Sequence, residues 1–214
     1  MRGWLRNNGL TVVTLGCFVL FLAGQALFGW REHNSELADH HRAAIGFLRY
    51  LHSGAFAEAT FENWESEFLQ MGSYVLLTAW LVQRGSAESR DPDTERPEPP
   101  VTDKSPGLVR RGGWPARLYA HSLSVTLLAA FVLSFLGHLI GGAQAYSEEQ
   151  LLQGKAPVSV AQFAADPEFW FQSMQNWQSE FLAVGCLVLF SRYLRERGSP
   201  ESKPVNAPHE ATGS

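Results

Sequence analysis

The stretch Asn63–Leu69, with the sequence NWESEFL, recurs 113 positions later as Asn176–Leu182, with the sequence NWQSEFL. The same offset relates further pairs of segments: Phe18–Leu20 with Phe131–Leu133, Gly24-Gln25 with Gly137-His138, and Arg84–Ser86 with Arg197–Ser199. A constant offset of this kind indicates an internal duplication. Each copy begins and ends with an apolar segment, so the repeated unit is predicted to be a helical hairpin.

Two apolar segments are long enough to cross a lipid bilayer. Leu10–Gly29 and Leu123–Gly142 contain no Asp, Glu, Lys or Arg, and about twenty helical residues match a hydrocarbon layer of roughly 30 Å. Phe68–Val82 and Phe181–Phe190 are shorter, but their equivalent places in the two copies predict that they also span. The sequence therefore predicts four spans, at residues 10–30, 66–84, 119–142 and 178–195.

The distribution of basic residues predicts the orientation of these spans. Thirteen of the seventeen Lys and Arg residues lie near the N-terminus, in the linker between the copies or near the C-terminus. Because Lys and Arg are enriched in cytoplasmic segments of membrane proteins, both termini and the linker are predicted to be cytoplasmic. Each copy then starts in the cytoplasm, crosses the membrane and returns to the cytoplasm. The two copies therefore have the same orientation and are parallel repeats.

The predicted fold is an all-α, integral membrane four-helix protein made of two parallel hairpin repeats with helical external segments. Residues 1–84 form the first repeat and residues 117–197 the second. The linker, residues 85–116, contains six prolines, and the tail, residues 198–214, is rich in Pro and Ser. Both contain few large apolar residues and are predicted to be disordered.

Local signals predict helices outside the bilayer. Apolar residues recur at helical spacing over residues 37–51, and a second helix is expected to start near Gly54. Ser147 and Gln150 resemble a capping box for a short helix. Asp166-Pro167-Glu168 is typical of the start of a helix, here one predicted to continue to Arg197.

Three further features belong to the predicted spans. Cys17 and Cys186 lie within them and are interpreted as small buried apolar residues. The spacing of Gly137 and Gly141 permits close approach of another helix. The N-terminal apolar run also resembles a signal peptide, but its counterpart in the second copy cannot be cleaved, so we expect it to be retained.

The repeated motif lies where the second helix of each copy enters the membrane. In one interpretation Trp64 and Trp177 are interfacial anchors, and the polar residues mark the water boundary. Asn63 and Glu67 are four residues apart, as are Asn176 and Glu180, so each pair shares a helical face. A charge facing lipid is costly, which favours glutamates that face the bundle.

Polar residues of the first helices are expected at the same depth. Gln25 and His138 occupy equivalent positions, and each could bond the glutamate of its own copy, Glu67 or Glu180. The predicted polar layer then contains Gln25, Asn63, Glu67, His138, Asn176 and Glu180. This layer could be a structural clasp. It could also be an ion or ligand site, because two nearby carboxylates in a partly dry site share a proton or bind a cation.

A second cluster consists of His33, Glu36 and His40, whose spacing could present three metal ligands on one helical face. The sequence lacks a phosphate-binding glycine loop, a Cys-x-x-Cys pair and a nucleophile elbow. No enzymatic activity and no cofactor are therefore predicted. Basic residues cluster only where they set topology, which argues against nucleic-acid binding.

The motif pair, the Asn7-Asn8-Gly9 segment before the first span and the Arg84-Gly85-Ser86 segment after the second carry a resemblance. The chain resembles an uncharacterised bacterial family of small four-span integral membrane proteins, classed as a domain of unknown function. The resemblance implies the bacterial inner membrane and no particular activity. The expected function is a non-catalytic structural or interaction role, with the lipid bilayer and a second copy or another membrane protein as partners. The alternative is a proton- or cation-binding transporter subunit that uses Glu67 and Glu180.

Overall fold

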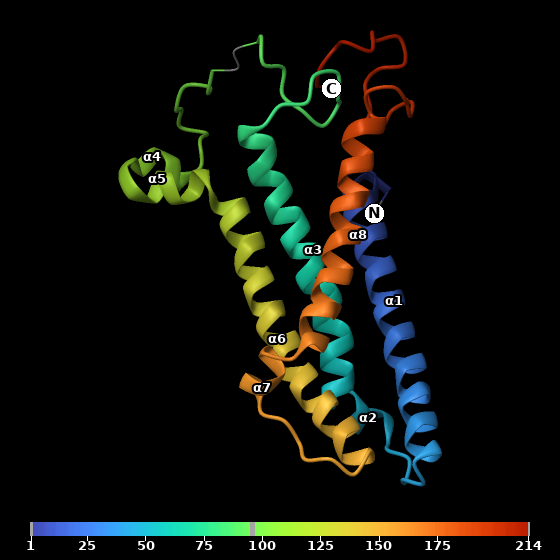
Figure 1. Cartoon of the computed structure of the whole chain (residues 1–214). Helices are drawn as coiled ribbons and strands as arrows, with labels where there is room; N and C mark the ends of the chain where they lie inside the picture. The colour runs from blue at the N-terminus through green and yellow to red at the C-terminus, as the bar shows by residue number, and fades with distance from the viewer. Residues whose placement is uncertain (1, 95–96, 214) are drawn as a thin grey trace. The chain divides into compact units, whose positions relative to one another are not determined.

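The computed structural model describes residues 2–94 and 97–213, and the regular structure in these ranges is entirely α-helical. The helices are α1 (Arg2–Asp39), α2 (Phe47–Tyr50), α3 (Gly54–Trp80), α4 (Gly107–Arg111), α5 (Gly113–Ala120), α6 (Ser122–Leu152), α7 (Val160–Ala164) and α8 (Pro167–Phe190) (Figure 1). The all-α class predicted from the sequence is therefore confirmed.

Two of these helices, α1 and α6, are long and apolar enough to span a membrane. The two segments are Trp4–Asp39 and Ser122–Leu152, whose most apolar 18-residue stretches have mean hydropathies of 2.1 and 2.2. The other two predicted spans overlap the C-terminal parts of α3 and α8, whose middle turns carry the polar motif. These polar residues lower the mean hydropathy of α3 and α8, which explains why neither helix is apolar enough to count as a candidate span by composition alone.

Local signals predicted where two of the long helices begin. α3 starts at Gly54, as expected. At the start of α8 the Asp166 carboxylate accepts a hydrogen bond of 3.0 Å from the Glu168 amide, the arrangement typical of a helix N-cap. The predicted end of α8 at Arg197 is wrong. α8 ends at Phe190, and the Arg195 guanidinium donates to the carbonyls of Ser191, Arg192 and Leu194 just beyond it.

The external helix predicted over residues 37–51 is largely absent, and only α2 is helical there beyond Asp39. The reason is a tertiary contact that competes with helix formation. Asn34 on α1 accepts from the Ile45 amide at 2.7 Å and donates to the Ile45 carbonyl at 3.0 Å. The Trp30 indole also donates to that carbonyl, at 2.8 Å. His41 has φ of 56°, which ends the preceding helix.

The capping box predicted at Ser147 is also wrong. Ser147 lies inside α6, and its hydroxyl bonds both the amide and the carbonyl of Val158. The capping box in this region is formed by Ser159 and Gln162 at the start of α7. Ser147 thus ties the segment after α6 back onto that helix rather than starting a new one.

The chain divides into two compact units, each made of two separate stretches of sequence. The first unit combines Met1–Phe61 with Gly137–Phe169, and the second combines Glu62–Leu136 with Trp170–Ser214. Each unit therefore contains segments of both sequence copies. The boundaries of the two repeats stay a prediction.

The core of the first unit is built where glycines of α6 meet bulky neighbours. Phe163 and Phe169 are fully buried and pack edge to face, with ring centroids 5.5 Å apart. A methyl group at Gly137 would lie 2.6 Å from the Phe61 ring, and one at Gly141 would lie 2.8 Å from Ala57. The close helix approach predicted from this glycine spacing is confirmed.

The repeat supplies a matched control for this packing. We expect Gly137→Ala to lower the free energy of unfolding by about 1–3 kcal/mol, because the added methyl group overpacks the contact with Phe61. The equivalent Gly24 has no atom within 4 Å of such a methyl group, so Gly24→Ala is expected to be neutral or slightly stabilising. Thermal unfolding of both variants in detergent checks this, and equal shifts would contradict it.

The buried side chains of the second unit are mostly small and polar. They include Ser66, Ser86, Ser89, Ser124, Ser134, Ser173 and Ser191. Large apolar side chains of the same unit point outward, among them Leu123 at 61% exposure and Leu133 at 69%. Small residues inside and large apolar residues outside are typical of helices that pack against one another in lipid.

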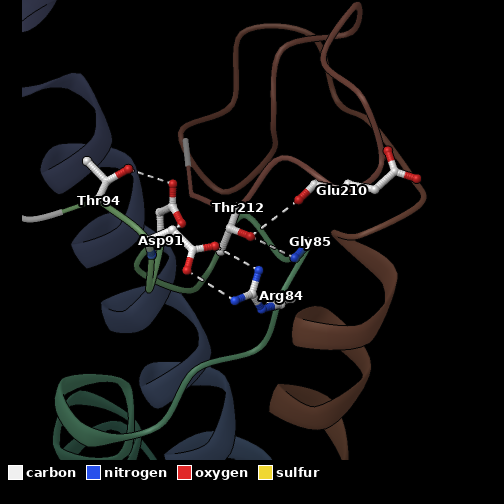
Figure 2. A network of polar contacts seen from close by, with 7 residues as sticks. Arg84, Gly85, Asp91, Thr94, Glu210 and Thr212 are labelled. Carbon is white, nitrogen blue, oxygen red and sulfur yellow. Dashed lines mark hydrogen bonds and ion pairs between the residues drawn. The ribbon is translucent and has the colours of Figure 1, made fainter.

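The linker and tail, predicted to be disordered, make definite contacts in their described parts. The Thr212 hydroxyl accepts from the Gly85 amide at 2.9 Å (Figure 2). Gly213 donates to the Ser86 carbonyl, also at 2.9 Å. Farther along the linker, residues 107–111 and 113–120 form α4 and α5. Glu95 and Arg96 of the predicted linker, and Ser214 of the predicted tail, lie outside the described residues.

Lys203 is the centre of this contact, which we call the tail clasp. Its side chain is 1% exposed, and its ammonium donates to the carbonyls of Gly85, Ala211 and His209 at 2.5, 2.8 and 2.9 Å. Burial, together with the guanidinium groups of Arg195 and Arg192, lowers the pKa of Lys203 below its usual value. The surrounding carbonyl oxygens offset part of the cost of burying this charge.

We expect Lys203→Met to release the tail from the linker, because these carbonyls lose their buried donor. Amide exchange of residues 203–213 should accelerate by about tenfold or more, which corresponds to the loss of roughly one or two hydrogen bonds. Hydrogen–deuterium exchange measures the effect. Lys104→Met is the control, because Lys104 is exposed. Unchanged tail protection in Lys203→Met would contradict the clasp.

Candidate functional site

The repeated motif contributes to a buried polar contact between α3 and α8, within the second unit. Glu65 is fully buried. One of its carboxylate oxygens accepts a hydrogen bond of 2.9 Å from the Ser173 hydroxyl and one of 3.2 Å from the Trp177 indole. One turn earlier on α3, the Glu62 carboxylate accepts a hydrogen bond of 2.6 Å from the Asn176 side-chain amide.

Helical spacing explains why these five residues meet. Glu62 and Glu65 are three residues apart on α3, and Ser173, Asn176 and Trp177 are three or four apart on α8, so each set shares one helical face. α3 supplies the acceptors and α8 the donors. We call this group of Glu62, Glu65, Ser173, Asn176 and Trp177 the α3–α8 polar seam. Because protein donors already bind its carboxylate oxygens, the seam is suited to joining the helices.

Aromatic side chains pack beside the seam. The Trp177 ring lies 6.1 Å from Phe131 and 6.3 Å from Phe135, measured between ring centroids. Trp170 also packs on Phe135, at 6.2 Å. Trp177, predicted as an interfacial anchor, thus has its indole N–H on Glu65 and its ring against α6. Trp64, the equivalent residue, is half-buried.

The motif serine has the same role in both copies. The Ser66 hydroxyl donates to the Asn63 carbonyl, and the Ser179 hydroxyl donates to the Asn176 carbonyl, each at 2.8 Å. A hydroxyl that bonds the preceding turn is satisfied within its own helix. The recurrence of serine in the motif therefore has a local backbone explanation.

The glutamates predicted as site residues occupy different environments. Glu67 and Asn63 are exposed, whereas Glu180 and Asn176 are half-buried. Glu67 was expected to face the bundle, but Glu65 takes that position, and two residues along a helix turn the side chain by about 200°.

The polar residues predicted from the first helix of each copy lie in the first unit. Gln25 donates to the Thr60 hydroxyl at 3.3 Å in place of the predicted bond to Glu67. His138 is fully buried, and its ring lies 4.9 Å from the Phe169 ring. Both residues therefore contribute to the packing of the first unit, and the six-residue layer is divided between the units.

The predicted metal cluster is not assembled. In residues 2–94 and 97–213, no group of three or more His, Cys, Asp or Glu side chains is arranged to hold a metal ion. His33 and Glu36 lie on α1, but His40 follows the end of that helix at Asp39. The His33 ring instead packs on Tyr50, with centroids 5.7 Å apart.

A difference between the two copies marks the seam in the sequence. Glu62 and Glu65 of the first copy correspond to Gln175 and Gln178 of the second. The acceptor residues of the seam are thus the acidic positions that become neutral in the second copy. Glu67 and Glu180 are identical in the two copies and Glu65 is not, which is why the sequence favoured Glu67 and Glu180.

Comparisons with known proteins gave a single match, to one family model. No curated protein and no solved structure matches the chain. One family model matches residues 1–214, that is, the whole chain. The protein therefore belongs to the family described as Domain of unknown function (DUF6766).

Proposed function

We propose that the protein is a four-span integral protein of the bacterial inner membrane with a non-catalytic structural or interaction role. The observation that carries the proposal is the inverted burial of its side chains. Serine, alanine and a few charged residues are buried, while most large apolar side chains are exposed. In water, each exposed Leu, Ile, Val or Phe forgoes about 1.5–3 kcal/mol of burial free energy. A lipid environment removes that cost.

The exposure of α6 gives the strongest support for a membrane location. Only 17% of its most apolar 18-residue stretch is buried inside the protein. The core helix of a soluble domain, in contrast, is mostly buried. α6 lies in the second half of the chain, so it is not a signal sequence. The most apolar 18-residue stretch of α1 is still less buried, at 6%. Both helices therefore offer apolar surfaces to a surrounding medium.

The remaining parts of the proposal follow from the motif helices. α3 and α8 would be the other two spans, joined by the polar seam, which keeps the buried carboxylates hydrogen-bonded away from lipid. The distribution of Lys and Arg supports termini and a linker on the cytoplasmic side. The partners we propose are the bilayer itself and a second copy or another membrane protein.

Alkaline extraction tests the membrane part of the proposal. After expression in a bacterium, the protein should stay with membranes washed in alkaline carbonate and should dissolve only when detergent is added. Peripheral proteins are released by this treatment, so they provide the internal control. Release of the protein into the alkaline supernatant would overturn the proposal.

The carrier alternative, based on Glu67 and Glu180, has a separate test. A non-catalytic role predicts that vesicles containing the purified protein conduct protons and common cations no faster than empty vesicles. The variants Glu67→Gln and Glu180→Gln should then leave the flux unchanged. Flux through the unmodified protein that both variants abolish would support the carrier and contradict the structural role.

A further inference from the structure

A basic and apolar element lies on the linker side of α6, within the second unit. α4 and α5 contact each other and are separated by Gly112. Gly112 and Gly113 have φ of 67° and 62°, a left-handed region that glycine adopts without strain. α5 ends at Ala120 and α6 begins at Ser122 (Figure 1). The α4–α5 element is therefore attached directly to a predicted span.

The charge of this element has one sign. Lys104, Arg110, Arg111 and Arg117 are all exposed. Asp103 precedes Lys104, but the chain contains no Asp or Glu from Lys104 to Ser147, so no acid lies within six residues of any of the three arginines. A group of exposed cations without acids is complementary to an anionic surface.

The same element exposes aromatic and aliphatic side chains. Trp114 is 74% exposed, Leu118 53%, Leu108 42% and Tyr119 40%. Trp114 and Leu118 are four residues apart on α5, so they share a helical face. Exposed Trp and Tyr beside Arg are typical of segments that lie at the headgroup level of a bilayer.

We propose that the α4–α5 element binds the headgroups of anionic phospholipids at the cytoplasmic surface of the membrane. The inference rests on the proposed membrane location, because α6 must place the element at the bilayer surface. Arg110, Arg111 and Arg117 bind the lipid phosphates, while Trp114 and Leu118 insert beside the acyl chains. The partner is the lipid surface and not free phosphate, since the apolar residues would gain nothing from a small ion.

The experiment uses the full chain in nanodiscs made of phosphatidylcholine alone or mixed with phosphatidylglycerol. Hydrogen–deuterium exchange of residues 107–120 should be slower with phosphatidylglycerol by on the order of tenfold, and added salt should reduce the difference. In the variant Arg110→Gln, Arg111→Gln, Arg117→Gln, exchange should be the same in both bilayers. The control variant Arg31→Gln, Arg42→Gln, Arg49→Gln also removes three cations and should keep the difference.

Two further readouts separate the possible failures. Amides of residues 125–136 in α6 report membrane insertion, and they should be protected in both kinds of nanodisc and in all variants. If they exchange freely, the proposed membrane location fails. If they are protected but residues 107–120 exchange equally in both bilayers, only the lipid proposal is overturned. Protection of residues 107–120 by inorganic phosphate in phosphatidylcholine nanodiscs would also overturn it.

Discussion

Replacing Glu65 with leucine is expected to lower the free energy of unfolding by about 3 kcal/mol, because one buried donor and one half-buried donor lose their acceptor. Those donors are the Ser173 hydroxyl and the Trp177 indole. Glu65→Gln keeps an acceptor oxygen and a similar shape, so its cost should be smaller, about 1 kcal/mol. Thermal or denaturant unfolding of the purified protein in detergent measures both effects.

The predicted repeat again supplies the control. Gln178 is the counterpart of Glu65 in the second copy and is exposed, so Gln178→Leu should change stability by no more than about 0.5 kcal/mol. Replacing a buried charge by an apolar residue can also stabilise a protein when the charge is poorly compensated. An increase in stability for Glu65→Leu would therefore contradict the seam as the contact that joins α3 to α8.

A charge placed on the outer face of α6 should have the second large effect. Leu133 is 69% exposed and lies in the predicted third span. If lipid surrounds this face, Leu133→Arg raises the cost of insertion by about 3 kcal/mol. We then expect the amount of protein in the membrane fraction to fall severalfold. Quantitative detection of the protein in washed membranes measures this.

The sign of this effect separates the two possible environments. On a water-exposed helix, Leu133→Arg would be a surface substitution with an effect of about 0.5 kcal/mol or less, and it would improve solubility. Leu133→Ala controls for loss of the side chain. Glu148→Arg adds a cation at an exposed position of the same helix outside the predicted span. Normal membrane levels of Leu133→Arg would rule out lipid contact at this face.

The sequence predicted features that depend on local interactions. The all-α class followed from composition and spacing, and the starts of α3 and α8 followed from Gly54 and from the cap at Asp166. The close approach at Gly137 was visible because small residues permit it wherever they occur on a helix. The helical class and the two helix starts depend on neighbours within a few residues, and the close approach depends on the small size of Gly137.

Features that depend on distant residues were missed. Residues 41–46 are not helical because Asn34 and Trp30 bind the backbone of Ile45. The tail is not free of contacts because Lys203 reaches the Gly85 carbonyl. The motif has a polar residue on more than one helical face, so the sequence alone did not decide whether Glu65 or Glu67 points inward. Equivalence between copies favoured Glu67, and the packing of α3 against α8 selects Glu65.

The central claim, a chain that crosses the bilayer with its linker inside the cell, is tested most directly by labelling single cysteines. In a background with Cys17 and Cys186 replaced by serine, the variants Ala43→Cys, Thr102→Cys and Lys155→Cys place one thiol at an exposed position in each connecting segment. With a membrane-impermeant maleimide, we expect positions 43 and 155 to react in intact cells and position 102 to react only after permeabilisation. Labelling of position 102 in intact cells, or equal labelling of all three positions, would contradict the claim.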